Sequence, residues 1–124
     1  MLLQNIDIEM NNQDIVNIPT GKWKIFGNME EGELDISSID SNGNLKGTAF
    51  GSPIQGFYHA ASGQIHFSRV IGVDQSQVYD GQISIIKINV DVADYLLAGS
   101  YVIFTSGFRG RPKLGWYATL NKVI

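Results

Sequence analysis

The sequence predicts an all-β fold, an eight-stranded antiparallel up-and-down (meander) barrel. Isoleucine and valine total 24 residues against 14 for alanine and leucine, and this balance favours strands over helices. After residue 20, apolar and polar side chains alternate in short segments that glycine-containing turns separate, with no 3.6-residue period. Eight such strands can close into a barrel, which removes the exposed edges of the sheet.

Four strands are expected in the first half of the domain. Trp23 and Ile25 alternate with lysines in the first strand, and Leu34 and Ile36 share a face of the second. Ser-Asn-Gly-Asn at residues 41–44 follows, with residue types that tolerate a positive φ in a tight turn. The third and fourth strands lie on either side of a proline. The eight expected strands are residues 21–28, 33–40, 45–51, 54–60, 64–71, 77–88, 94–105 and 114–122.

The other four strands follow a turn at residues 61–63, Ala-Ser-Gly. In the fifth strand Ile65, Phe67 and Ile71 share one face, which we expect to point into the barrel because it is the more apolar. Arg69 lies on the same face. The sixth and seventh strands are longer, and the eighth closes the chain.

The chain has 124 residues and 13.7 kDa, the size of one domain. We expect a single barrel domain over residues 21–124, preceded by an N-terminal arm or extra strand over 1–20, where the alternation is weaker. Residues 1–10 have no basic segment of the kind that begins a signal peptide, and no apolar run reaches the length of a membrane span. The expectation is a soluble cytoplasmic protein that does not bind membranes.

Charge and cysteine content exclude several classes of function. Nine basic against twelve acidic residues give a net charge of −3, which argues against a nucleic-acid-binding protein. Without cysteine there is no disulfide, no thiolate metal site and no cysteine nucleophile. His59 and His66 lie on different expected strands without metal-ligand spacing, and there is no Gly-x-Ser-x-Gly motif. We therefore expect no metal, no cofactor and no catalytic residues.

Four short motifs resemble the avidin family. Gly21-Lys22-Trp23 is similar to the Gly-x-Trp that opens barrels of the calycin group, which includes lipocalins and avidins. Residues 42–48, Asn-Gly-Asn-Leu-Lys-Gly-Thr, resemble the Gly-x-x-x-Gly-Thr hairpin of avidin and streptavidin. Residues 78–82 resemble the aromatic-x-Gly start of the sixth avidin strand, and residues 115–120 the Trp-x-Ala-Thr near the avidin C-terminus. The motifs occur in the same order over residues 21–122, and the resemblance implies an avidin-like barrel.

The resemblance also implies that the ligand is not biotin. Ala49 stands where the family has a tyrosine, and Arg69 stands where it has the tryptophan that walls the biotin rings. The polar residue near the end of the last avidin strand has no counterpart. Only Tyr79 and Trp116 match residues that line the family's pocket. We expect biotin to bind weakly or not at all.

Arg69 is the most informative candidate for ligand binding. A guanidinium on an apolar face needs an anion or several acceptors, because burying an unpaired charge is costly. It either grips a carboxylate or phosphate of a ligand at the barrel mouth, pairs with an internal acid, or stretches out of the rim. Aromatic and polar side chains on the neighbouring strands complete the expected pocket. The expected ligand-binding residues are Arg69, Gln77, Tyr79, Tyr101 and Trp116.

Two functions remain open. The first is a non-enzymatic barrel that binds a small organic ligand with a polar or anionic end. The alternative is a structural or self-association module whose barrel is filled by its own side chains. Interior volume separates the two. Residues expected to leave room are Ala49, Gly51, Gly56 and Gly81, and residues able to fill it are Phe57, Tyr58, Tyr79 and Tyr101. A barrel enzyme would need His66 to face inward, and its alternation places it outward.

Apolar residues on the predicted outer face suggest a homo-oligomer. Alternation places Phe26 and Tyr117 outward, and the pair Ile85-Ile86 makes one long strand apolar on both faces. Residues 106–113 carry three basic side chains beside glycines, which could form an anion-binding nest or a solvated hairpin loop.

Two further expectations concern single groups of residues. Trp23 is expected to plug the closed end of the barrel, with Lys122 across its ring as a cation–π partner. Glu30, Glu31 and Glu33 are expected to surround Gly32 in a solvated hairpin turn.

Overall fold

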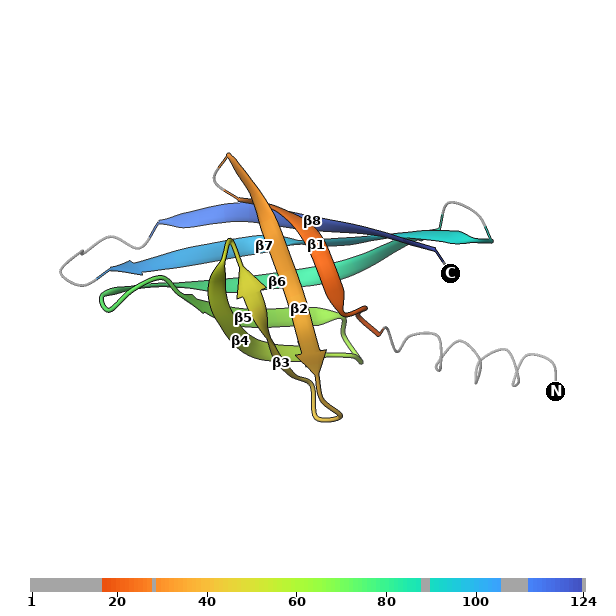
Figure 1. The fold of residues 1–124 in the computed structure, drawn as a ribbon, viewed down its shortest axis with the longest axis horizontal. Coiled ribbons are helices and arrows are strands. Elements are labelled where there is room, and N and C mark those ends of the chain that lie inside the picture. Colours follow the sequence, from red (N-terminus) through yellow and green to blue (C-terminus); the bar gives the residue numbers. More distant parts are fainter. Residues whose placement is uncertain (1–16, 28, 88–89, 106–111, 124) are drawn as a thin grey trace.

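A computed structural model describes residues 17–27, 29–87, 90–105 and 112–123. Eight strands close into one barrel in the order of the chain (Figure 1). The strands are β1 Gly21–Gly27, β2 Glu30–Ile39, β3 Asn44–Ala49, β4 Ser52–His59, β5 Gln64–Val70, β6 Gln75–Lys87, β7 Val92–Thr105 and β8 Lys113–Val123.

Every neighbouring pair of strands is antiparallel, and β8 returns to pair with β1 between Lys24↔Thr119 and Gly27↔Trp116. The predicted fold class, an eight-stranded up-and-down barrel, is confirmed. The described residues contain no helix, and so none that could cross a membrane. β6 and β7 are the longest strands, with 13 and 14 residues (Figure 1).

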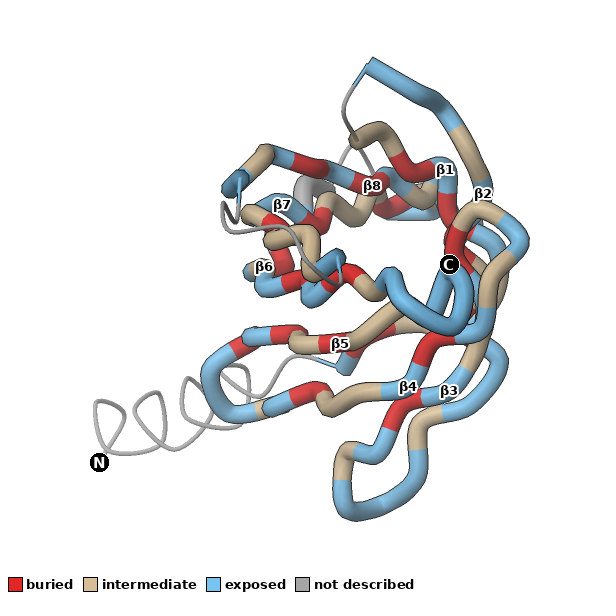
Figure 2. The backbone as a smooth tube through the Cα atoms, turned by 90° about the vertical axis from the view of Figure 1, so that its left-hand side faces the viewer, coloured by how far each residue is buried: buried red, intermediate tan, exposed pale blue. Residues whose placement is uncertain are grey.

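The two-residue alternation of the sequence is reproduced in the burial of the strands. Buried and exposed positions follow each other along the tube in Figure 2. All eight strands contribute side chains to the core, because every strand of a closed barrel has one face inside. The inner residues include Trp23, Ile25, Leu34, Ile36, Leu45, Ala49, Ile54, Tyr58, Ile65, Phe67, Tyr79, Ile83, Leu97, Tyr101, Trp116 and Ala118.

Gly56 and Gly81 do not leave free space inside the barrel, contrary to the prediction, and Gly51 lies in the β3–β4 turn rather than on a strand. A Cβ on Gly56 would stand 1.9 Å from the carbonyl oxygen of His66 and 2.7 Å from the Cβ of Phe67. A Cβ on Gly81 would stand 2.7 Å from the indole of Trp116. At Gly56 the backbone of the paired strand β5 comes close, and at Gly81 the indole of Trp116 on β8 comes close, so these groups already occupy the space.

The β1–β2 turn is shorter than predicted. Met29 adopts a left-handed conformation, with a φ of 67°, and β2 begins at Glu30. Glu30, Glu31 and Glu33 are therefore exposed strand residues, and the prediction that they surround a turn was wrong. The fifth strand likewise ends earlier than predicted. Ile71 lies beyond it and is 38% exposed, so it does not join the inner face.

Trp23 is 1% exposed at the end of the barrel where the chain enters, as predicted. Its indole N–H donates to the carbonyl of Pro19 at 3.3 Å, and its ring meets Tyr95 edge-on at 6.2 Å. Lys122 is exposed and makes no cation–π contact with Trp23 in the described part of the chain, so that prediction was wrong. The ring of Tyr95 packs against Trp23, a contact that had been expected from Lys122.

Ile18 is buried at the same end, and residues 17–20 are not in a strand. The rest of the predicted N-terminal arm, residues 1–16, lies outside the described residues, and so do residues 106–111 of the basic loop.

Candidate functional site

At one end of the barrel, which we call the mouth, β1, β3, β5 and β7 end and β2, β4, β6 and β8 begin. Arg69 lies near the mouth end of β5. It is paired directly with Gln77 on β6, because the two strands run antiparallel in register. Tyr79 follows Gln77 two residues further along β6, on the same inner face.

Arg69, Gln77 and Tyr79 form a hydrogen-bonded group that we call the mouth cluster. The Nη1 of Arg69 donates to the Oε1 of Gln77 at 3.0 Å, and the hydroxyl of Tyr79 donates to the same oxygen at 2.6 Å. The Nη2 of Arg69 donates to the carbonyl of Phe50 at 3.4 Å. The Nε of Arg69 is buried and has no hydrogen-bond partner.

Phe50 covers the mouth cluster from the β3–β4 turn. Its φ of 50° is left-handed, which is uncommon for a residue other than glycine. The guanidinium carbon of Arg69 lies 5.1 Å from the centroid of the Phe50 ring, a cation–π contact. The ring also packs on β2 at Gly32, where a Cβ would stand 2.3 Å from it.

Aromatic rings fill the barrel beneath the mouth cluster. Phe67, Tyr79 and Tyr101 stand opposite one another on β5, β6 and β7, and their rings stack at centroid distances of 4.7 Å. Trp116 meets Phe67 and Tyr79 edge-on at 5.7 and 5.6 Å. Such offset and edge-on arrangements are the favourable geometries for aromatic rings. A ligand at the mouth would therefore rest on this aromatic layer.

Arg69 carries a positive charge that no acid neutralises within the described ranges. The two ion pairs there are Lys24–Glu31, with the Nζ 4.0 Å from the Oε1, and His66–Asp80, both on the outer surface. An Arg that is half-buried without a carboxylate differs from the usual rule that buried charges are paired. An anion from outside the chain would provide the missing charge.

Burial also affects the tyrosines of this end. It raises the pKa of Tyr79 to about 12, although the positive charge of Arg69 opposes the shift. The pKa of Tyr101 is raised by burial and then by the nearby carboxylate of Glu30, again against Arg69. The Tyr79 hydroxyl therefore stays protonated at neutral pH and remains a hydrogen-bond donor.

The structure brings all five predicted ligand residues together. Three form the mouth cluster, Tyr101 stacks on Tyr79, and Trp116 stands edge-on against it. Trp116 is fixed from two sides, since its indole N–H lies 3.1 and 3.2 Å from the carbonyls of Asp80 and Ser100. Phe57, expected as an interior filler, instead faces outward and contacts His59.

Phe50 was missed by the sequence reasoning. It lies at the end of a predicted strand, in a turn, and the alternation of inward and outward side chains holds only within strands. The available signal was the pair Phe50-Gly51 shortly before Pro53, which is typical of a tight turn.

The histidines lie on the outer surface. His66 faces away from the barrel interior, as predicted, and pairs through Nδ1 with the carboxylate of Asp80. The ring of His59 lies 5.7 Å from that of His66. The described part of the chain holds no group of three or more His, Cys, Asp or Glu side chains that could bind a metal.

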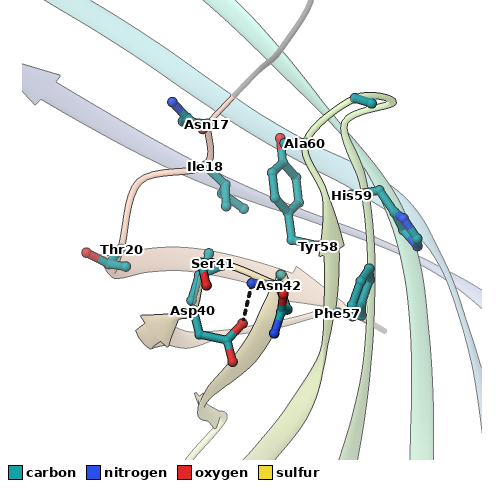
Figure 3. Close-up of a pocket in the computed structure, with 13 residues that line it drawn as sticks. Asn17, Ile18, Thr20, Asp40, Ser41, Asn42, Phe57, Tyr58, His59 and Ala60 are labelled. Carbon is teal, nitrogen blue, oxygen red and sulfur yellow. Dashed lines mark hydrogen bonds between the residues drawn. The ribbon is translucent and has the colours of Figure 1, made fainter.

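A hollow of about 510 Å³ lies at the end opposite the mouth. Figure 3 shows it between the entering chain at Ile18, the β2–β3 turn and the end of β4 at Tyr58. Asp40 organises its floor by accepting hydrogen bonds from the backbone N–H groups of Asn42 and Asn44. The side-chain amide of Asn44 also donates to Asp40, at 2.9 Å, and has the largest effect in lowering the pKa of that carboxyl. The backbone N–H groups lower the pKa further. The carboxylate is thus already used to hold the turn.

No family model matches the chain, and no curated protein or solved structure was found that matches it. The fold and the site define its class as a closed eight-stranded up-and-down β-barrel with a cationic, hydrogen-bonded cluster at one end.

Proposed function

We propose that the chain is a non-enzymatic small-molecule-binding barrel of the avidin-like kind, whose ligand places a polar or anionic end against Arg69. The observation that carries this proposal is the Arg69 Nε, a buried donor without a partner on a cation without a described counter-charge. An unpaired buried donor costs about 1–3 kcal/mol, and a ligand acceptor would recover that free energy.

The position of the cluster supports the same proposal. Binding sites commonly combine an apolar wall with a few polar groups that orient the ligand. Here the wall is the aromatic layer of Tyr79 and Tyr101, and the orienting groups are the amide of Gln77 and the guanidinium of Arg69. Biotin fits poorly, because Ala49 offers no hydroxyl to the interior and Arg69 replaces an aromatic wall.

A library of small polar compounds, screened by NMR against the ¹⁵N-labelled protein, is expected to contain binders that shift the Arg69 Nε–H signal. These binders should lose at least tenfold in affinity for Arg69→Met, because the cation and its free donor are gone. They should keep their affinity for Lys22→Met, a matched loss of one exposed positive charge on β1. Binders that are insensitive to Arg69→Met, or a nanomolar constant for biotin, would contradict the proposal.

A self-associating module is the second candidate, and the outer face of β1 and β8 favours it. Phe26 and Tyr117 stack there at 4.7 Å, and Tyr117 is 45% exposed. They border a hollow of about 700 Å³ that also exposes the backbone of Gly99 and Gly115. Flat aromatic rings beside bare backbone suit close contact with a second copy of the chain.

If this face joins two copies, light scattering of the wild type should give a multiple of 13.7 kDa, and Tyr117→Glu should return the mass to that of a monomer. The substitution places a charge at the centre of the contact, where it would be desolvated. Val73→Glu, at a fully exposed turn residue near the mouth, is the matched control and should leave the mass unchanged. A wild-type monomer at all concentrations would rule this candidate out.

A further inference from the structure

The hydrogen bonds of the mouth cluster leave donors free and use up its amide acceptor. An arginine can only donate, so the atom of Gln77 that faces Arg69 must be the oxygen. That oxygen also receives the Tyr79 hydroxyl, so both of its lone pairs are occupied. The Nε2 group of Gln77 and the Nε–H of Arg69 take part in none of these bonds. What the cluster offers a ligand is therefore N–H groups, and it favours a ligand atom that only accepts.

The charge around the cluster suits one negative charge. Arg69 is its single cation among the described residues, and the carboxylate of Glu30 is near enough to influence Tyr101 from the same end of the barrel. A monoanion on Arg69 would be neutralised. A dianion would leave one charge uncompensated and would be repelled by Glu30.

The depth of the cluster limits what part of a ligand can reach it. Tyr79 is 1% exposed and Phe67 is 2% exposed, so the space below Arg69 is already filled. The Arg69 guanidinium lies against the Phe50 ring and its Nε is buried, so the group that reaches this Nε once the ring has moved must be thin and planar. A carboxylate has this shape and a tetrahedral phosphate does not.

We propose that the mouth cluster binds a monocarboxylate, carboxylate first, with the remainder of the ligand directed out of the barrel. This inference rests on the proposed function, and narrows it to one ligand chemistry. One carboxylate oxygen accepts from the Arg69 Nε–H, and the Gln77 Nε2 group provides a second donor. The backbone of Phe50 is held on β2, where its N–H donates to the carbonyl of Glu33 at 3.0 Å, so admitting the ligand requires the Phe50 side chain alone to rotate away from Arg69.

The test compares four ligands that share a phenyl ring, added to the ¹⁵N-labelled protein while the Arg69 Nε–H and Gln77 side-chain amide signals are followed. The probes are benzoate, benzamide, phenyl phosphate and benzylamine. Benzoate is expected to shift both signals and to bind at least tenfold more tightly than benzamide, because the amide replaces a charged acceptor by a donor. Phenyl phosphate should bind more weakly than benzoate, and benzylamine should not shift the signals.

Two variants test whether benzoate binds at the mouth cluster. Gln77→Glu supplies Arg69 with an internal carboxylate, so benzoate should lose at least tenfold in affinity while the protein stays folded. Arg69→Lys keeps the charge but removes the Nε–H and the planar edge, and should also lose at least tenfold. Lys22→Met is the control and should bind benzoate like the wild type.

The outcomes distinguish this inference from the broader proposal. Tighter binding of phenyl phosphate or of benzamide, with loss in Arg69→Lys, overturns the carboxylate inference but keeps a ligand site at Arg69. Shifts that are equal in Gln77→Glu and the wild type overturn the binding geometry. No shift with any of the four probes overturns the carboxylate inference, and the library screen with Arg69→Met then decides the proposed function separately.

Discussion

Trp116→Ala is expected to lower the free energy of unfolding by about 3–5 kcal/mol, the range for removing a large buried aromatic side chain. Trp116 is 3% exposed and its ring contacts Phe67 and Tyr79 inside the barrel. Its indole N–H also lies within hydrogen-bond distance of carbonyls on both β6 and β7. The substitution thus removes a hydrogen bond as well as the ring contacts by which β8 packs against β5 and β6 inside the barrel.

Urea unfolding followed by far-ultraviolet circular dichroism would measure the effect. Tyr117→Ala is the matched control, because Tyr117 is the next residue on β8 and points outward with 45% exposure. It should cost less than about 1.5 kcal/mol, since an exposed aromatic loses little on truncation. Equal losses for the two variants would show that Trp116 is not a central part of the core.

A double-mutant cycle sharpens this prediction. Gly81→Ala should destabilise the wild type, because its Cβ would stand 2.7 Å from the indole. In the Trp116→Ala background the indole is gone and the carbonyl oxygen of Ala98, at 3.1 Å, remains the near neighbour, so the same methyl group should cost less by about 0.5–3 kcal/mol. Additive effects would contradict the packing of Gly81 under the ring.

Alternation was sufficient to predict the barrel because one face of each strand is inside a closed sheet. It placed Gln77, Tyr79 and Ile83 on the inner face of β6, and all three are buried there. It also placed Arg69 on the inner face of β5. Pairing of adjacent antiparallel strands then brings such residues together, so part of the candidate site could be predicted from parity alone.

Three-dimensional packing could not be predicted in the same way. Parity says which face a residue lies on and not how far a neighbour's ring reaches across that face. Gly81 was expected to leave room, but Trp116 two strands away extends over it. Turn residues escape parity altogether. Phe50 covers Arg69 because its left-handed turn conformation directs the ring over the guanidinium, and alternation along a strand does not predict such a conformation.

Gly56→Ala is expected to destabilise the protein by about 3 kcal/mol or more, although it adds only one methyl group. Its Cβ would stand 1.9 Å from the carbonyl oxygen of His66 and 2.5 Å from the Cα of Phe67, both of which are backbone atoms of β5. Backbone atoms cannot rotate away as a flexible side chain can. The methyl group must therefore push β4 and β5 apart, which strains their hydrogen bonds along the register from Ile54↔Arg69 to His59↔Gln64.

Gly72→Ala provides the comparison within the same chain. Gly72 lies in the turn between β5 and β6, has no positive φ, and a Cβ there would meet nothing within 4 Å. Replacing this glycine reduces only the freedom of the unfolded chain, so Gly72→Ala should leave stability unchanged or raise it by about 0.4–1 kcal/mol. The two variants should therefore move the urea midpoint in opposite directions or by clearly different amounts.

Because Ile54↔Arg69 belongs to the strained pairing, Gly56→Ala should also weaken benzoate binding at the mouth, whereas Gly72→Ala should not. Equal midpoints for the two variants would mean that β4 and β5 can separate at Gly56 without cost, and the close approach described above would then be wrong.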